Sequence, residues 1–282
     1  MRMSGSEETH VALPDGYQAW ARYWPAEPCT EAVLYLHGIQ SHAGWYTESA
    51  RAINEAGFAV LQADRRGSGR NQQDRGHAAS ARQLVEDGIA CADKLREVTG
   101  VGTVHIIGVS WGGKLAAAMH AARPDITSSL VLIAPGLFPI VDVSAADKFR
   151  IGLSMISNPR RTYDIPLNDP ELFTDQPDKI RFLREDRLQL HQATAGFFLA
   201  SRRMDRMWVK MRQSAAVPLL VFLAGAERII DNDATRRFVR ELHWPCRHVT
   251  LFERARHTIE FSADRDEFIS ELIRWLRNPA DY

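Results

Sequence analysis

The sequence has few cysteines, no net charge and no long apolar run. Of its 282 residues only three are cysteines, Cys29, Cys91 and Cys246, and they lie far apart without any C-x-x-C spacing. This pattern predicts neither a disulfide framework nor a zinc site and favours a reducing, cytoplasmic location. The 35 Lys and Arg residues balance 35 Asp and Glu residues, so no overall charge directs the chain to nucleic acid or to an anionic membrane surface.

Targeting and metal-binding patterns are also missing. The opening stretch MRMSGSEETH lacks the apolar centre of a signal peptide, and no apolar run approaches the roughly 20 residues of a membrane-spanning helix. The sequence has no H-E-x-x-H pattern, and DRRGSGR (64–70) lacks the lysine and the spacing of a phosphate-binding P-loop. We therefore expect an intracellular protein that uses no cofactor, no metal and no nucleic-acid partner. The oligomeric state stays open, with a homodimer as one candidate.

Strand-like segments alternate with helix-like segments over most of the chain. The segment 9–24 contains the turn sequence Pro14-Asp15-Gly16, which predicts a hairpin. A buried strand at 31–38 follows, and then come predicted helices at 46–57, 81–99, 113–124, 233–243 and 263–278 and strands at 58–64, 103–109, 128–136, 218–225 and 247–253. Strands that are apolar on both faces predict an α/β fold, in which a mostly parallel, eight-stranded sheet is covered by helices on both faces.

The alternation breaks between residues 137 and 216. Helix-like stretches at 146–156 and 191–211 follow one another there without a strand-like stretch between them. We therefore predict a core domain formed by 1–136 and 217–282, and a helical cap (lid) formed by 137–216 that lies over the carboxyl edge of the sheet.

The predicted cap carries two kinds of side chain that suggest a role. Its methionines and aromatic residues favour equally the lining of an acyl-chain pocket and the packing of the cap's own helices. Its basic stretch indicates a solvated helix face more than recognition of a phosphate headgroup. That stretch consists of Arg202, Arg203, Arg206, Lys210 and Arg212, with Asp205 among them.

The stretch VHIIGVSWGGKLAAA (104–118) places a serine between glycines where a predicted strand meets a predicted helix. Gly108, Ser110 and Gly112 form the pattern G-x-S-x-G. Small neighbours let the backbone adopt a tight, strained turn that exposes the hydroxyl at its apex. We therefore predict that Ser110 is a nucleophile, and the alternative is an ordinary glycine-rich turn.

A serine hydroxyl needs a base, and the histidine pKa suits that task near neutral pH. Reactive groups in an open parallel sheet gather beyond the carboxyl ends of the strands. His257 follows the last predicted strand and can reach back to Ser110, so we predict that it is the base. Other histidines are placed within a strand or at its start (His105, His248) or in predicted helices (His120, His191).

The acid that orients the base is expected in the loop LAGAERIIDND (223–233). This loop offers Glu227, Asp231 and Asp233, and spacing alone does not choose among them. Glu227 stands four residues beyond Leu223, the predicted strand end, whereas Asp231 resembles the N-cap of the next helix. We favour Glu227 and keep Asp231 as the alternative acid.

Two backbone N–H groups are needed to stabilise an oxyanion, and loss of one costs about 3 kcal/mol of transition-state stabilisation. One donor is the residue after the nucleophile, Trp111. The other belongs to the loop after strand 31–38, where His37-Gly38 leaves Ile39 as the donor. We predict that His37 and Gly38 also bind substrate, and the alternative is a turn that satisfies only its own backbone.

With these groups in this order, the chain resembles the α/β-hydrolase superfamily, and within it the monoacylglycerol lipase and lysophospholipase-like branch. The resemblance spans nearly the whole chain. It is carried by HGIQSHAGWY (37–46), DRRGSGRN (64–71) and GVSWGG (108–113), and LNDPELFTDQP (167–177) is similar to a stretch of the branch's cap. The matching residues are His37, Gly38, His42, Gly44, Tyr46, Asp64, Arg66, Gly67, Gly69, Gly108, Ser110, Gly112 and Gly113.

The resemblance implies a serine esterase with a catalytic triad. It implies Ser110 as nucleophile, His257 as base and an oxyanion hole of Ile39 and Trp111, and it aligns Glu227 with the family's usual aspartate. The glutamate has an extra methylene that needs a shifted loop, which keeps Asp231 as an alternative. The chain also departs from the family at Ala224, usually glycine; Ser68, usually histidine; Asn71, usually serine; and Trp111, usually methionine.

The expected reaction is hydrolysis of a carboxylic ester through an acyl-enzyme intermediate. Acylglycerol or lysophospholipid-like lipid esters are the substrates that the resemblance implies. A thioesterase, an amidase and an acyltransferase would use the same triad, and a ligand-binding protein of the same fold would use none of it.

Overall fold

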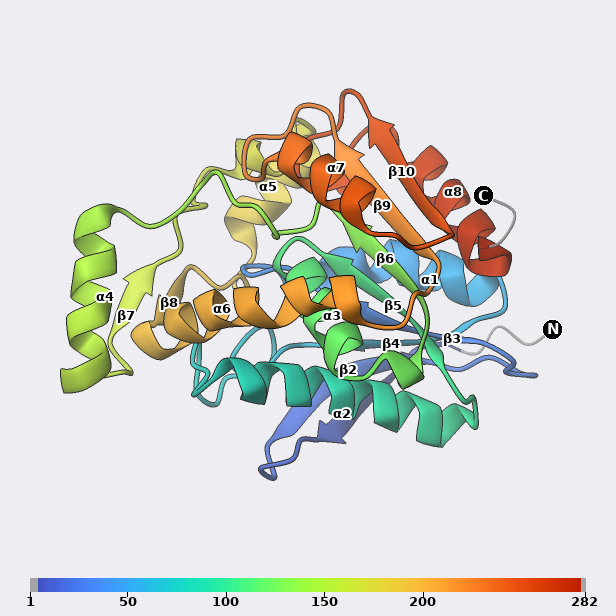
Figure 1. The fold of residues 1–282 in the computed structure, drawn as a ribbon, viewed down its shortest axis with the longest axis horizontal. Coiled ribbons are helices and arrows are strands. Elements are labelled where there is room, and N and C mark those ends of the chain that lie inside the picture. Colours follow the sequence, from blue (N-terminus) through green and yellow to red (C-terminus); the bar gives the residue numbers. More distant parts are fainter. Residues whose placement is uncertain (1–4, 280–282) are drawn as a thin grey trace.

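The computed structural model describes residues 5–279, which contain an eight-stranded sheet with helices on both faces (Figure 1). The strand order is β1-β2-β4-β3-β5-β6-β9-β10. The strands are β1 (Glu7–Ala12), β2 (Gln18–Trp24), β3 (Ala32–Leu36), β4 (Ala59–Ala63), β5 (Val104–Val109), β6 (Thr127–Ile133), β9 (Leu219–Ala224) and β10 (Arg247–Phe252). β1 and β2 form the predicted antiparallel hairpin, β2 pairs antiparallel with β4, and the remaining pairs are parallel. The predicted mostly parallel sheet is confirmed.

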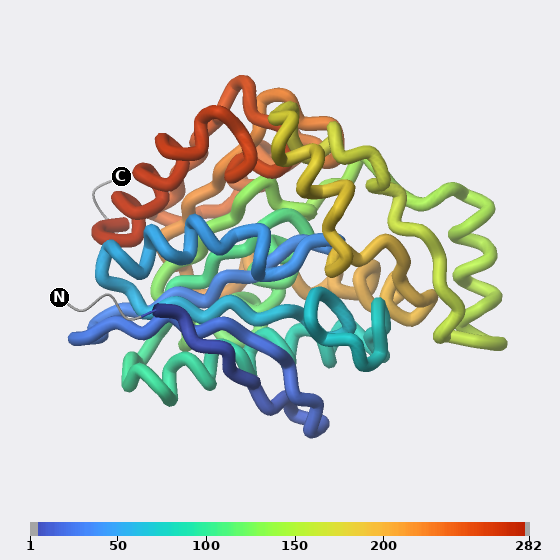
Figure 2. The backbone as a smooth tube through the Cα atoms, turned by 180° about the vertical axis from the view of Figure 1, so that it is seen from behind, coloured from blue at the N-terminus to red at the C-terminus, as the bar shows by residue number. Residues whose placement is uncertain are grey.

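Helices follow the parallel strands, as the alternating pattern predicts. The helices outside the segment 137–216 are α1 (Thr47–Glu55), α2 (Ala81–Thr99), α3 (Trp111–Ala122), α7 (Asn232–Glu241) and α8 (Arg265–Arg277). Short 3-10 helices lie at Ala43–Tyr46, Pro124–Ile126, Pro170–Leu172, Val209–Gln213 and Ile259–Phe261 (η5). Figure 1 shows α2 and α3 in front of the sheet, and Figure 2 shows α1 and α8 on the opposite side. None of the helices within 5–279 is both long and apolar enough to cross a bilayer.

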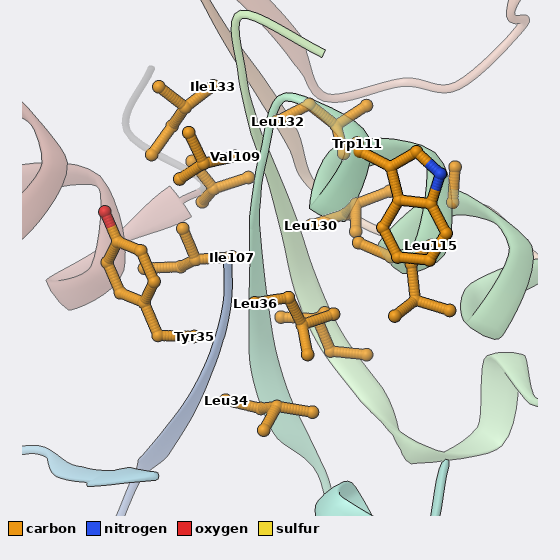
Figure 3. Close-up of a cluster of buried hydrophobic side chains, with 14 of the residues drawn as sticks. Leu34, Tyr35, Leu36, Ile107, Val109, Trp111, Leu115, Leu130, Leu132 and Ile133 are labelled. Atoms are coloured by element: carbon orange, nitrogen blue, oxygen red, sulfur yellow. The ribbon is translucent and has the colours of Figure 1, made fainter. Parts of the chain in front are cut away.

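The core is continuous through the sheet because alternate side chains of each central strand point to opposite faces. In Figure 3, Tyr35 and Ile107 lie on one face, while Leu34, Leu36 and Leu130 lie on the other with the first turn of α3. All five side chains are buried. This double-sided burial explains the near-continuous apolar runs of these strands, and it leaves the strand ends as the place for polar groups.

The segment 137–216 contains strands as well as helices. Its elements are α4 (Ala145–Ser157), β7 (Thr162–Asp164), α5 (Pro177–Glu185), β8 (Gln192–Thr194) and α6 (Ala195–Trp208). β7 and β8 pair antiparallel, so the expectation of helices without an intervening strand was wrong. Each of these strands has three residues, too few to produce an alternating pattern, and β8 runs directly into α6. His191 precedes β8 and is not a helix residue.

Candidate active site

The site begins at the turn between β5 and α3, where Ser110 has a strained backbone with φ 53° and ψ −120°. Three main-chain hydrogen bonds hold the turn: Ser110 N–H donates to Ile133 O at 2.9 Å, and Ser110 O accepts from the N–H groups of Gly113 and Gly136. The flanking glycines are required because the chain is so close around the serine. A Cβ at Gly108 would lie 2.4 Å from the carbonyl oxygen of Gly112.

Ser110, His257 and Glu227 form one chain of hydrogen bonds. His257 lies in the loop after β10, and its Nε2 is 2.7 Å from Ser110 Oγ. Its Nδ1 is 2.8 Å from Glu227 Oε2, and the side chains of His257 and Glu227 are each 2% exposed. If Nδ1–H donates to the carboxylate, Nε2 is free to accept the serine proton.

The structure separates the two candidate acids. Glu227 Oε1 accepts from the N–H groups of Arg228 and Ile229, which leaves Oε2 for His257. Burial raises the pKa of Glu227, but the charge and hydrogen bond of His257 and these two N–H groups outweigh burial and hold the pKa below its ordinary value. Asp231 instead caps α7, where its Oδ1 accepts from Ala234 N–H at 2.8 Å. The glutamate's own loop thus accommodates its additional methylene.

The loop after β3 brings Ile39 beside the nucleophile. Ile39, Ser110 and Trp111 all line one cavity of about 160 Å³. Gly38 N–H donates to Ser41 Oγ at 2.8 Å, which fixes the turn next to Ile39. Trp111 is the first residue of α3, so its N–H belongs to the positive end of a helix dipole.

The His37 side chain holds this loop through main-chain hydrogen bonds. Its Nε2 accepts from Arg65 N–H at 2.8 Å, so its Nδ1–H donates to Gly38 O at 2.8 Å. Burial and the Arg65 charge hold the pKa of His37 well below its ordinary value, so the ring is neutral. Both ring nitrogens hydrogen-bond to main-chain groups of the neighbouring loops, and substrate binding by His37 and Gly38 stays a prediction.

The cavity has apolar walls and a charged end. Pro139, Val141, Ile165, Leu167, Phe198 and Ile230 line the apolar part. At the charged end, Lys114 Nζ lies 2.6 Å from Asp205 Oδ1, and Arg202 pairs with the other oxygen of the same carboxylate. No sequence pattern indicates that Lys114 of α3 and Asp205 of α6 form an ion pair, because the contact depends on how α6 packs on α3.

The basic stretch and the apolar residues of 137–216 serve several purposes. The basic residues are exposed, in agreement with a solvated face, although Arg202 also borders the cavity. Met204, Trp208 and Met211 are buried in the core, and Phe198 lines the cavity. Some apolar residues of this segment therefore pack in the core and others line the cavity beside Ser110, and binding of an acyl chain there stays a prediction.

Further contacts join the segment 137–216 to the loops of the site. Asp186, just after α5, accepts from Trp45 Nε1 at 2.7 Å and lies 3.1 Å from His42 Nε2. Thr258, next to His257, donates its N–H to Phe173 O at 2.9 Å. Within 5–279, no group of three or more His, Cys, Asp or Glu side chains is arranged to hold a metal ion.

The sheet order, the strained serine turn after β5 and the Ser110–His257–Glu227 chain at the strand ends define an α/β-hydrolase. A family model described as "Serine aminopeptidase, S33" matches residues 27–264. The chain belongs to this family of α/β-hydrolases.

Individual relatives resemble the chain over nearly its whole length. Monoglyceride lipase of Homo sapiens is 23% identical over 288 residues, which cover 95% of this chain and 89% of that protein. The crystal structure of Paleococcus ferrophilus monoacylglycerol lipase has a TM-score of 0.82 at 22% identity and covers 94% of this chain and 100% of that one. A soluble variant of Saccharomyces cerevisiae monoglyceride lipase, in complex with a substrate analog, has a TM-score of 0.85 at 16% identity, with coverage of 99% and 98%. At these identities the structural likeness establishes the fold.

Proposed function

We propose that the protein is a serine hydrolase that cleaves carboxylic esters of lipids through an acyl-enzyme intermediate. The observation that carries the proposal is the continuous chain from Ser110 through His257 to Glu227 beside an apolar cavity. Ser110 Oγ attacks the ester carbonyl while His257 Nε2 takes its proton, and Glu227 stabilises the imidazolium. The N–H groups of Ile39 and Trp111 bind the oxyanion, the alcohol leaves with the proton from His257, and water then releases the acid.

The cavity and the relatives support the proposed substrate class. Apolar walls suit an acyl chain, and the relatives named as monoglyceride lipases support an acylglycerol. We further propose that residues 137–216 act as a cap on a core of 1–136 and 217–282, because Ile165 and Phe198 of this segment line the cavity next to Ser110. Arg202 also lines the cavity, and its positive charge suits a phosphate headgroup. Hydrolysis of a lysophospholipid is therefore the informative comparison with hydrolysis of a monoacylglycerol.

The test is turnover by matched variants on a substrate panel. Ser110→Ala is expected to lower hydrolysis of a monoacylglycerol and of p-nitrophenyl butyrate by about 10⁴-fold or more, whereas Ser270→Ala, at an exposed serine of α8, keeps wild-type turnover. Retained turnover in Ser110→Ala would refute the assignment. A preference for lysophospholipid over monoacylglycerol would move the substrate class toward charged headgroups.

Amide hydrolysis is the second candidate reaction, because the matching family is described as an aminopeptidase. The same triad and oxyanion donors serve both reactions. An amino-acid p-nitroanilide and a thioester in the panel separate these reactions from ester hydrolysis, and faster turnover of either would replace the ester proposal. Transfer to an acceptor alcohol would show as ester products in the presence of glycerol.

A further inference from the structure

Arg65 is a buried cation that forms no ion pair with a carboxylate within residues 5–279, although the charge of the adjacent Asp64 acts on it. Arg65 follows β4 and stands between Asp64 and Arg66, two residues that match the motif of the resembled family, whereas Arg65 does not belong to that motif. Only 9% of its surface is exposed. Its guanidinium carbon lies 4.8 Å from the ring centre of Trp111 and 4.7 Å from that of Phe197. Among the described residues, its Nε and Nη1 have no hydrogen-bond partner. Burial of such a charge is costly, so its placement needs an explanation.

The hydrogen bonds of Arg65 hold the segment 37–39, here called the oxyanion loop, which contains the proposed donor Ile39. Nη2 donates to the carbonyl oxygen of Ile39 at 2.8 Å. Its main-chain N–H donates to His37 Nε2, and His37 in turn holds Gly38 O. One residue therefore fixes the segment 37–39 through its backbone and through its side chain.

The same guanidinium also contacts the side chain of Trp111, whose main-chain N–H is the other proposed oxyanion donor, because it stacks on the Trp111 ring. The Trp111 ring is also held by Ser201, whose Oγ accepts from Nε1 at 2.8 Å. Phe197 and Ser201 both belong to α6, so the contact links the oxyanion loop to the segment proposed as a cap.

We propose that Arg65 is a positioning residue for the oxyanion hole: it fixes the Ile39 carbonyl group and the Trp111 ring relative to each other, and its positive charge lies next to both residues. The inference rests on the proposed function. The stacking replaces a carboxylate partner, which would cancel the charge near the developing oxyanion. Donors fixed in advance need no reorganisation when the oxyanion forms, so the contribution is made in the transition state more than in substrate binding.

The test compares Arg65→Met and Arg65→Lys with Arg75→Met. Methionine keeps an apolar stem and removes the charge and the bond to Ile39, while lysine keeps the charge without the planar group. Arg75 serves as the control because it is a partly buried arginine that also donates to main-chain carbonyls, those of Gly69, Leu188 and Gln189. On p-nitrophenyl butyrate, Arg65→Met is expected to lower kcat about 10- to 100-fold with a change in KM of less than about threefold.

The inhibition constant of a trifluoromethyl ketone is a second measurement, and a merely structural role of Arg65 would leave it unchanged. Ser110 Oγ adds to its carbonyl carbon, the serine proton passes to His257 Nε2, and the carbonyl oxygen becomes the oxyanion. The inhibition constant of this ketone is expected to rise by the same factor as kcat falls in Arg65→Met, and to stay within about threefold of wild type in Arg75→Met.

Three outcomes decide the inference. Unchanged kcat and ketone affinity in Arg65→Met, with only a lowered Tm, would overturn it. If Arg65→Met does not fold, Arg65→Lys carries the test: we expect at least about a fivefold loss of kcat, and wild-type kcat contradicts the proposal. Absence of turnover and of Ser110 modification in the wild type would overturn the proposed function and this inference together, whereas failure in the variants alone overturns only the inference.

Discussion

Glu227 shows how one residue departs from a family pattern and still fits its place. Its Oε1 is held by the N–H groups of Arg228 and Ile229, so the longer side chain folds back on its own loop and presents Oε2 to His257. Because interactions with His257 and the backbone lower its pKa despite burial, the stabilising contribution of this carboxylate is present above its ordinary pKa. That contribution is lost only as the pH falls through the lowered pKa of Glu227.

The choice of acid is tested by Glu227→Gln and Asp231→Asn. Glutamine cannot stabilise the imidazolium, so we expect kcat to fall by about 10³- to 10⁴-fold. Asparagine can still cap α7, and Asp231→Asn is expected to leave kcat within about threefold and to change stability by less than about 1 kcal/mol. Steady-state kinetics and thermal melts measure both effects, and a larger kcat loss at Asp231 would reverse the assignment.

At the scale of elements, buried Glu260 joins η5 to β3 and α1. Its Oε1 accepts from Ser49 N–H at 3.1 Å, and its Oε2 accepts from Tyr35 Oη–H at 3.4 Å. Burial is the main cause that raises the pKa of Glu260 to about 7, and the nearby charge of Glu48 adds to it. The folded protein therefore holds a proton on Glu260 at pH values where the unfolded chain has released it.

This difference predicts a pH-dependent stability. As the pH rises from about 4.3, the value of an unfolded glutamate, to about 7, the folded state binds more protons than the unfolded state, so the free energy of unfolding falls. Glu260→Gln mimics the protonated side chain. Between pH 5 and pH 8, its free energy of unfolding is expected to rise by about 1–3 kcal/mol relative to that of the wild type. Urea unfolding at the two pH values measures the difference, and equal changes in both proteins would contradict it.

Elements with strong local signals were predictable from the sequence, and those that depend on packing were not. The helix α2 begins after Ser80, whose side chain accepts from Gln83 N–H, and ends at Gly100, whose φ of 76° suits glycine; its predicted range, 81–99, is confirmed. β7 and β8 were missed because three residues give no periodicity and their pairing depends on contacts formed only in the fold.

At the scale of the whole molecule, the topology explains why the site could be predicted. Ser110, Glu227 and His257 follow β5, β9 and β10, three strands that run parallel within one sheet, so their loops meet at one edge. Chain order and strand ends were enough to propose these three residues. The contacts of Lys114 with Asp205 and of Arg65 with Phe197 were beyond that argument, because they join the core to the segment 137–216, whose placement has no periodic signal.

The measurement that tests the central claim most directly is covalent labelling with a fluorophosphonate, followed by mass spectrometry of the peptides. The probe reacts with a serine whose proton is removed by a neighbouring base, so we predict one adduct, on Ser110, in the wild type and in Ser270→Ala. We predict none in Ser110→Ala. An adduct on another residue, or full labelling of Ser110→Ala, would contradict the claim that Ser110, His257 and Glu227 form a catalytic triad with Ser110 as its nucleophile.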